Sequence, residues 1–161
     1  MLLCLIMKNA YECILSTLLA DLPGAIQPED LDARITGIAS DSRRVEPGCL
    51  FVAVRGSSFD GHRYIPDAVA RGAAAVVGME GGISLPVPYI QVSDSRMAIP
   101  YLAAAFYGHP GRKMFMIGVT GTDGKTTTCN LIYHILQAAG YRAGMISTVN
   151  AVIGDQVLDT G

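Results

Sequence analysis

The feature that most limits how this chain can fold is a glycine-rich stretch, GVTGTDGKTTT, over residues 118–128. It lies between an apolar run at 114–119 and a segment of helical periodicity that ends before Gly140. Glycines at such a junction let main-chain N–H groups converge on one point, and the helix that follows adds unpaired amides and the positive end of its dipole. We therefore predict a strand at 114–119, a phosphate-binding loop and a helix over 125–139, which is how a parallel α/β domain begins.

The residue types in this loop suit a nucleoside triphosphate. Lys125 can reach the terminal phosphates as a mobile point charge, and the Thr126 hydroxyl is placed to ligate Mg²⁺. The spacing departs from the strict phosphate-loop pattern, because Val119 occupies the position of its first glycine. The alternative is a strand-to-helix turn that is capped by threonine and binds no ligand. The other predicted ATP-binding residues are Gly121, Thr122, Asp123, Gly124 and Thr127.

Upstream of the loop, short strand-like and helix-like pieces alternate in the manner of an α/β unit. Strands are predicted at 35–39, 49–54, 73–77 and 89–92. Helices are predicted at 64–71, closed by Gly72, and at 94–107, where Pro100 should kink the helix or delay its start. The opening MLLCLIMK is expected to pack in an N-terminal helix with Ile14, Leu15, Leu18 and Leu19, or else to be a frayed start.

The breaker Gly-His-Pro-Gly at 108–111 predicts a domain boundary near residue 110. The expected organisation is a helical lead-in at 1–34, a small α/β domain at 35–110 and the start of a second α/β domain at 111–161. In the second domain a strand at 144–148 and a hairpin at 151–158 should follow the helix. About fifty residues are too few for a parallel sheet covered on both faces, so we expect the N-terminal part of a longer polypeptide.

Composition excludes several other classes of protein. Only 16% of the residues are charged and the formal net charge is −2, so a nucleic acid is not an expected partner. The apolar run at the start is too short to span a bilayer and has no basic residue before it. The cysteines at 4, 13, 49 and 129 form no CxxC pair, which favours free thiols over a metal site. These features predict a soluble protein of the cytoplasm.

The stretch GVTGTDGKTTT resembles the GxTGTNGKTT loop of the Mur ligases, ATP-dependent enzymes that build the peptide precursor of bacterial peptidoglycan. Asp123 departs from that pattern, since the family usually carries asparagine there. A carboxylate beside the phosphates is unfavourable unless it faces Mg²⁺ or solvent, so it should lower nucleotide affinity.

The segment SDSRRVEPGCLFVAVRGSSFDGHRYIPDAVARGAAAVV is similar to the domain of these ligases that binds the UDP end of the precursor. The resemblance implies contacts with uracil, ribose and diphosphate. Without it, an internal Asp41–Arg43 ion pair and an ordinary polar loop are the simpler interpretation, and Asp60-Gly61-His62 indicates a turn and helix cap. Asn150 is equally suited to binding ligand or to capping its strand. The residues implied in UDP-substrate binding are Ser40, Ser42, Arg43, Ser57, Ser58, Phe59 and Asn150.

AAAFYGHPGRKMFMIGVTGTDGKTTT and AGMISTVN resemble the ligases that add the third residue, meso-diaminopimelate or L-lysine, to UDP-MurNAc-L-Ala-D-Glu. The implied chemistry converts the D-glutamate carboxylate to an acyl phosphate with ATP and Mg²⁺, and the incoming amine then displaces phosphate. The resemblance places the catalytic groups and the amino-acid-selecting domain after Gly161, so no catalytic residue is expected here and the isolated chain should be inactive. The alternatives are a ligase adding D-Ala-D-Ala, a non-catalytic nucleotide-binding module, and a general P-loop NTPase or kinase.

Overall fold

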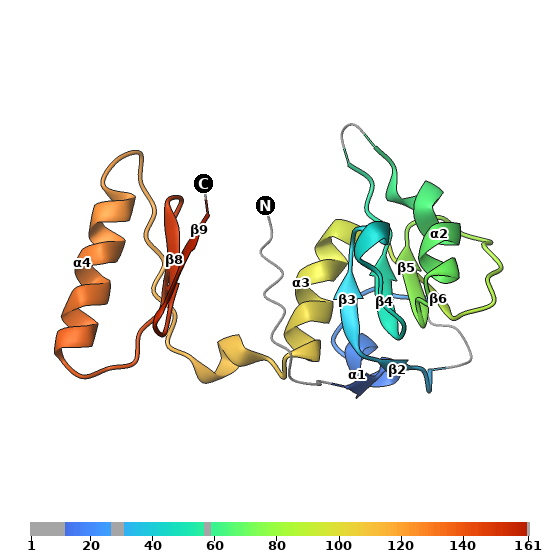
Figure 1. Cartoon of the computed structure of the whole chain (residues 1–161), viewed down its shortest axis with the longest axis horizontal. Helices are drawn as coiled ribbons and strands as arrows, with labels where there is room; N and C mark the ends of the chain where they lie inside the picture. The colour runs from blue at the N-terminus through green and yellow to red at the C-terminus, as the bar shows by residue number, and fades with distance from the viewer. Residues whose placement is uncertain (1–11, 27–30, 57–58, 161) are drawn as a thin grey trace. The chain divides into compact units, whose positions relative to one another are not determined.

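The computed structural model describes residues 12–26, 31–56 and 59–160, which divide into two compact units. One unit ends at Met114 and the other begins at Phe115 (Figure 1). Each has its own sheet, so the mixed α/β class predicted from the sequence is confirmed.

The larger unit is built on a four-stranded parallel sheet in the order β3-β4-β5-β6. The strand order follows the chain order, and the register pairs Ile38 with Leu50, Leu50 with Ala75, and Val76 with Tyr89. All four predicted strands are present in shorter form, because pairing stops where the chain turns toward the next helix or loop. Their bounds are Gly37–Ala39 (β3), Cys49–Val52 (β4), Ala75–Gly78 (β5) and Tyr89–Gln91 (β6).

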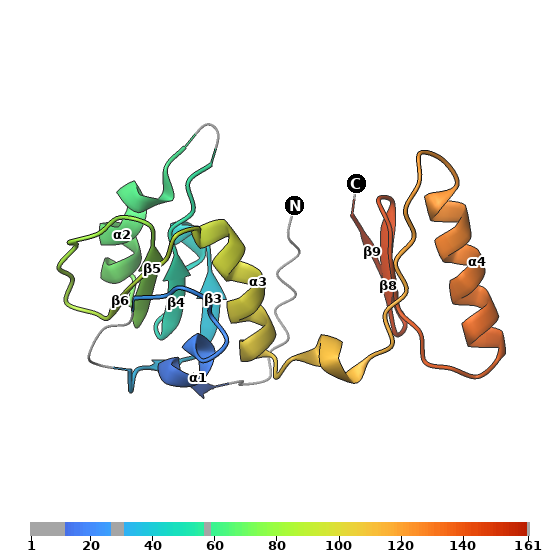
Figure 2. The same cartoon turned by 180° about the vertical axis from the view of Figure 1, so that it is seen from behind.

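Helices cover both faces of this sheet, with α1 and α3 on one side and α2 on the other (Figures 1 and 2). A short antiparallel pair, β1 with β2, lies beside α1. The remaining bounds are Cys13–Ile14 (β1), Leu15–Leu19 (α1), Arg34–Ile35 (β2), Ile65–Ala70 (α2) and Ser95–Phe106 (α3), with 3-10 turns at Ser42–Arg44 (η1), Gly61–Tyr64 (η2) and Pro110–Lys113 (η3).

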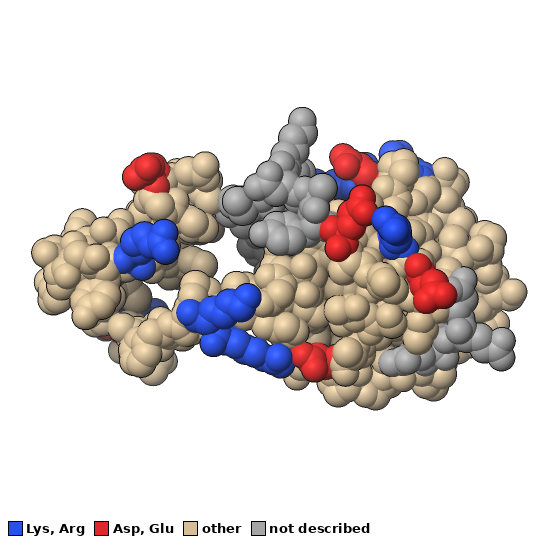
Figure 3. All heavy atoms as spheres, turned by 90° about the horizontal axis from the view of Figure 1, so that it is seen from below, with Lys and Arg blue, Asp and Glu red and all other residues tan. Residues whose placement is uncertain are grey.

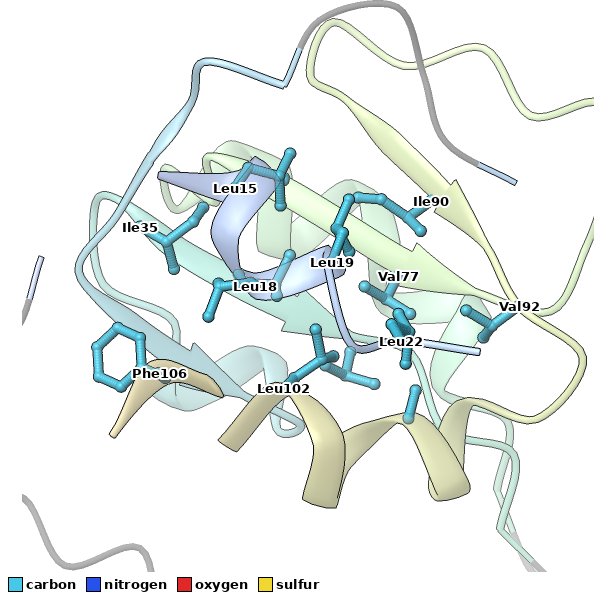
Figure 4. Packing of buried hydrophobic residues seen from close by; sticks show 14 residues of the cluster. Leu15, Leu18, Leu19, Leu22, Ile35, Val77, Ile90, Val92, Leu102 and Phe106 are labelled. Atoms are coloured by element: carbon cyan, nitrogen blue, oxygen red, sulfur yellow. The ribbon is translucent and has the colours of Figure 1, made fainter. Parts of the chain in front are cut away.

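Aliphatic side chains fill the layer between the sheet and the α1/α3 face. Leu18 of α1, Val77 of β5 and Leu102 of α3 are fully buried in it (Figure 4). A smaller cluster around Phe51 and Ile65 fills the opposite face under α2. Continuous burial of β4 and β5 on both faces is typical of a parallel sheet and explains their uninterrupted apolar sequence.

The helix predicted at 94–107 is α3, and Pro100 does not delay its start. The Asp94 carboxylate accepts hydrogen bonds from the main-chain N–H groups of Arg96 at 2.8 Å and Met97 at 3.1 Å. This cap sets the helix start upstream of the proline. Of the two effects expected from Pro100, a kink or a delayed start, the delayed start is therefore wrong.

The predicted N-terminal helix is partly confirmed. Leu15, Leu18 and Leu19 lie in α1 and are buried, whereas Ile14 lies in strand β1 and is half exposed. Ile14 is extended because it pairs with Arg34 of β2. MLLCLIMK lies outside the described residues.

The smaller unit contains helix α4, Lys125–Ala138, and an antiparallel sheet of β7, Met145–Ile146, β8, Asn150–Ile153, and β9, Gln156–Asp159. The helix predicted at 125–139, the strand predicted at 144–148 and the hairpin predicted at 151–158 are thus confirmed. The parallel strand–loop–helix–strand unit is not, because this sheet is antiparallel throughout and the segment at 114–119 forms no strand.

That segment is apolar but exposed: 93% of Phe115 and 72% of Met116 are accessible to solvent. An apolar run becomes a strand only when a neighbouring strand pairs with its main chain, and no described residue pairs with this one. The prediction of a strand at 114–119 is therefore wrong, because no described strand pairs with this segment.

Charged side chains of both signs are interspersed on the visible face of the larger unit (Figure 3). Among the described residues, no helix combines the length and the apolar character that crossing a bilayer requires. Cys49 is a buried free thiol, and Cys13 and Cys129 are half-buried and free. Cys4 lies outside the described residues.

Candidate functional site

The carboxyl ends of β3, β4 and β5 meet at one edge of the parallel sheet, and polar segments follow each of them. Residues 40–44 follow β3, residues 53–60 follow β4, and Met79 and Glu80 follow β5. Ligands of open parallel sheets bind outside this edge. The predicted UDP-binding residues that the structure places after these strands are Ser40, Ser42, Arg43 and Phe59.

The turn after β3 contains a close ion pair. The Asp41 carboxylate accepts from the Arg43 guanidinium at 2.8 and 3.0 Å and from the Arg43 main-chain N–H at 3.0 Å. These bonds, the guanidinium's foremost, hold the pKa of Asp41 at about 2. The Arg43 side chain is still 83% exposed, whereas Ser42 is buried and Ser40 exposed. The predicted ion pair is thus present, and it leaves the guanidinium accessible to an anion from solvent.

The loop after β4 is closed at its base. Arg55 pairs with Asp60 in an antiparallel bridge, and the Gly56 N–H donates to the Phe59 carbonyl at 2.8 Å. Phe59 is 60% exposed, which suits stacking of its ring against a planar ring. Ser57 and Ser58, the other predicted residues of this loop, lie outside the described residues.

The predicted cap at Asp60-Gly61-His62 is confirmed, and the same residues make a connection that was not predicted. The Asp60 carboxylate accepts from the His62 main-chain N–H at 3.0 Å and contacts His62 Nδ1 at 2.6 Å. His62 Nε2 accepts from the Met79 N–H at 2.9 Å, which links the loop after β4 to the end of β5. This bond spans seventeen residues, and no local sequence signal indicates it.

Asp60, His62 and Glu80 also have the chemistry of a metal site, since their ligand atoms lie within 4.8 Å of one another. Their existing bonds argue against one. Both ring nitrogens of His62 are engaged, and the Arg55 guanidinium joins Asp60 at 3.2 Å to Glu80 at 3.1 Å. A cation already bridges the carboxylates, so the cluster is an internal hydrogen-bond network.

In the smaller unit the glycine-rich loop at 118–124 turns at glycines and leads directly into α4. Gly124 has φ +75°, where a residue without Cβ is favoured, and α4 begins at the next residue, Lys125. Among the residues that the structure describes, the main-chain N–H groups of 121–127 have no protein partner. Free amides at the start of a fourteen-residue helix fit phosphate oxygens.

The lysine of this loop folds back over it. Lys125 Nζ donates to the main-chain carbonyls of Gly121 at 2.6 Å and Thr122 at 3.0 Å. Asp123, two residues before Lys125, is exposed, and Thr126 is half-buried at the first turn of α4. The Lys125 ammonium, the loop amides and the Thr126 hydroxyl thus lie in one short segment. Together they offer the hydrogen-bond donors and the metal-ligating oxygen that a triphosphate with Mg²⁺ requires.

Asn150 lies at the start of β8, in the smaller unit, and takes part in a tight turn. Its side-chain oxygen accepts from the Ser147 hydroxyl at 3.0 Å, and its N–H donates to the same hydroxyl oxygen at 3.1 Å. This bonding fits the capping of strand β8, one of the two roles, capping or ligand binding, that the sequence allows for Asn150. The side-chain amide nitrogen has no bond among the described residues and remains available as a donor.

Comparison with known proteins gives two family matches. The profile of the Mur ligase family, catalytic domain, matches residues 34–107, and that of the Mur ligase middle domain matches residues 119–161. The chain is 51% identical over 131 residues to a UDP-N-acetylmuramyl-tripeptide synthetase of Roseiflexus sp. (strain RS-1), an alignment covering 79% of this chain and 25% of the relative. It is 46% identical over 142 residues to a UDP-N-acetylmuramoyl-L-alanyl-D-glutamate--2,6-diaminopimelate ligase of Geobacillus kaustophilus, covering 88% of this chain and 29% of the relative.

Solved structures give the same result. A UDP-N-acetylmuramoylalanyl-D-glutamyl-2,6-diaminopimelate--D-alanyl-D-alanyl ligase from Acinetobacter baumannii superposes with a TM-score of 0.61 at 26% identity, covering 82% of this chain and 29% of that one. A UDP-N-acetylmuramoyl-L-alanyl-D-glutamate--2,6-diaminopimelate ligase superposes with a TM-score of 0.66 at 20% identity, covering 92% and 30%, which supports the fold alone. The chain thus spans under a third of the length of these relatives.

Proposed function

The chain belongs to the Mur ligase family, and from this we propose that it supplies the UDP-precursor site and the ATP phosphate loop of a third-residue ligase of peptidoglycan synthesis. The reaction joins meso-diaminopimelate or L-lysine to UDP-MurNAc-L-Ala-D-Glu. Diaminopimelate is the first amino acid to test, because it is the one named for the Geobacillus kaustophilus relative. The reaction belongs in the cytoplasm, where ATP and soluble UDP-linked precursors are found.

One observation carries this proposal. The identity of 46% with a third-residue ligase extends over 88% of the chain, so the alignment includes parts of both units. A generic P-loop NTPase accounts for the loop at 118–128 and leaves the polar edge of the parallel sheet without a role.

In the smaller unit we assign the loop amides and Lys125 to the phosphates of ATP. The Thr126 hydroxyl is the proposed ligand of Mg²⁺, an ion that offsets charge as two anions approach. The ammonium must leave the carbonyls of Gly121 and Thr122 to contact a phosphate. The proposed ATP-binding set is Gly121, Thr122, Asp123, Gly124, Lys125, Thr126 and Thr127.

In the larger unit we assign the sheet edge to the UDP end of the precursor. The exposed Arg43 guanidinium pairs with the diphosphate, and the Phe59 ring packs against the uracil or ribose. Ser40, Ser42, Ser57 and Ser58 supply hydroxyl groups. Asn150, which belongs to the smaller unit, is assigned separately as a side-chain amide donor to the UDP-precursor.

Calorimetry tests the proposal. We expect the 161-residue chain to bind UDP-MurNAc-L-Ala-D-Glu, and ATP with Mg²⁺ more weakly, without measurable amide formation when diaminopimelate or lysine is added. A general NTPase or kinase gives a signal with ATP and none with the UDP-sugar. Binding of ATP alone would therefore reject the proposed function in favour of that alternative.

A further inference from the structure

The loop after β4 is fastened to the rest of the larger unit through His62. The imidazole is buried, with 4% of its side chain exposed, and it contacts two different segments of the chain. One ring nitrogen faces Asp60 and the other faces the main chain of Met79, which follows β5.

The partners of His62 fix its proton. The Met79 N–H can only donate, so Nε2 must be the acceptor and is unprotonated. The proton of the neutral ring therefore resides on Nδ1, where it is donated to the Asp60 carboxylate. A single rigid ring thus joins the end of the loop to the end of β5, with its orientation set from both sides.

A second connection runs in parallel at the surface. The Arg55 guanidinium, at the start of the loop, contacts Asp60 at 3.2 Å and Glu80 at 3.1 Å. The main-chain carbonyl of Glu80 accepts in turn from the Tyr89 hydroxyl at 2.8 Å. Because Arg55 and Asp60 are also paired through their main chains, both ends of the loop are held at one point.

The loop anchored in this way carries Phe59. The main-chain groups of Gly56 and Phe59 border the edge of the parallel sheet that is assigned to the precursor. Preorganised loops bind more tightly because less conformational freedom is lost on association. We propose that His62 is a positioning residue for the UDP-precursor, holding Asp60 and the neighbouring Phe59 against the end of β5 in the arrangement that receives the uridine end. This inference rests on the proposed function and adds to it a buried residue that does not itself touch the ligand.

Two substitutions at His62 separate its contact with Asp60 from its hydrogen bond with the Met79 N–H. His62→Asn keeps a polar group where Nδ1 lies but has nothing to accept the Met79 N–H. His62→Gln places a carbonyl oxygen near the position of Nε2 and keeps that acceptor. The matched control is Leu102→Val, which removes one methylene from the core on the α3 face of the sheet. It lowers stability without removing either hydrogen-bond partner of His62.

The experiment measures dissociation constants for UDP-MurNAc-L-Ala-D-Glu by calorimetry well below each thermal midpoint. We expect His62→Asn to weaken binding about tenfold and His62→Gln to return it to within about threefold of the parent, since only the first frees the loop from β5. Leu102→Val should lower the midpoint and leave affinity within about twofold. Hydrogen exchange at the amides of Gly56 and Met79 should accelerate in His62→Asn and stay slow in Leu102→Val.

The possible results are distinct. If His62→Asn lowers the thermal midpoint but leaves affinity and Gly56 exchange unchanged, His62 is merely structural and the inference is wrong, while the proposed function stands. If the unchanged chain does not bind the precursor, the proposed function fails and the inference fails with it. Loss of affinity in Leu102→Val equal to that in His62→Asn also overturns the inference, because general destabilisation then explains both.

Discussion

Lys125 Nζ lies 2.6 Å from the main-chain carbonyl oxygen of Gly121, four residues earlier in the chain. The ammonium is therefore satisfied by the loop itself, using neutral oxygens in the place of phosphate oxygens. A phosphate oxygen carries negative charge and adds a Coulomb attraction to the ammonium that a neutral carbonyl oxygen does not offer, so a phosphate competes successfully for it. Binding of ATP should exchange these carbonyls for phosphate without moving the free loop amides.

Replacing this lysine tests the exchange. Lys125→Met should weaken ATP binding by at least about tenfold, because a charge-assisted hydrogen bond contributes about 1.5–3 kcal/mol. Affinity for UDP-MurNAc-L-Ala-D-Glu, measured by the same calorimetry, should be retained. Lys113→Met is the control for loss of one positive charge, and an equal loss of ATP affinity in that variant would contradict the assignment.

The loop carboxylate is expected to oppose the nucleotide. Asp123 is exposed, and Asp123→Asn should tighten ATP binding about two- to fivefold, through removal of a screened repulsion. The gain should shrink at high ionic strength, which a titration of ATP at two salt concentrations can measure. Asp155→Asn, in the exposed β8–β9 turn, makes the same change in net charge. A gain in both variants would indicate an effect of net charge alone.

The ion pair after β3 distinguishes a structural from a ligand-binding role for Arg43. Its guanidinium is largely exposed, so Arg43→Ala should shift the thermal midpoint by no more than about 2 °C. If Arg43 pairs with the diphosphate, the same change should weaken binding of the UDP-precursor about tenfold. Arg44→Ala serves as the control, and similar affinities for the two variants would leave Arg43 with the ion pair as its only role.

What could be predicted from the sequence depended on how far apart the interacting residues lie. The Asp41–Arg43 pair, the Asp60 cap and the helix after Gly124 involve close neighbours in the chain, so local chemistry indicated them. The His62–Met79 bond depends on two strands pairing first, and nothing near either residue indicates it.

At 114–119 the sequence predicts an element that the structure lacks, whereas the His62–Met79 bond is present and was not predicted. Its apolar run has the composition of a buried strand, yet a strand is defined by its hydrogen-bonded neighbour, which composition cannot supply. β5, with a similar run of apolar residues, lies between β4 and β6 and is fully buried. Sequence alone therefore identifies segments that are able to form strands. It is less able to identify which of these segments have a strand to pair with.

Acid should destabilise the larger unit through Asp60. The main-chain N–H and then the ring of His62 bond to its carboxylate, and with Arg55 nearby they lower the pKa of Asp60 from 3.8 to about 2. The folded state therefore binds this proton less readily than the unfolded state, so the stabilisation is complete above about pH 5 and is lost as pH falls toward 2. The thermal midpoint should fall over that range, and less steeply in Asp60→Asn. Glu46→Gln should retain the slope of the parent, and an unchanged slope in Asp60→Asn would exclude Asp60 as a source.

The close approach at Gly61 gives a steric test of the same loop. A Cβ at Gly61 would lie 2.6 Å from the Val54 carbonyl oxygen and 2.7 Å from the Val54 nitrogen, so main chain would have to move. Gly61→Ala should therefore cost about 1–3 kcal/mol of stability, measured by denaturant unfolding. Because the loop at 55–60 begins beside Val54, precursor binding should weaken as well, whereas ATP binding in the other unit should not. Gly111→Ala is the matched control, since no atom lies within 4 Å of its added Cβ. That variant should be neutral or slightly stabilising, and a comparable loss in both variants would show that the contact with Val54 is not the cause.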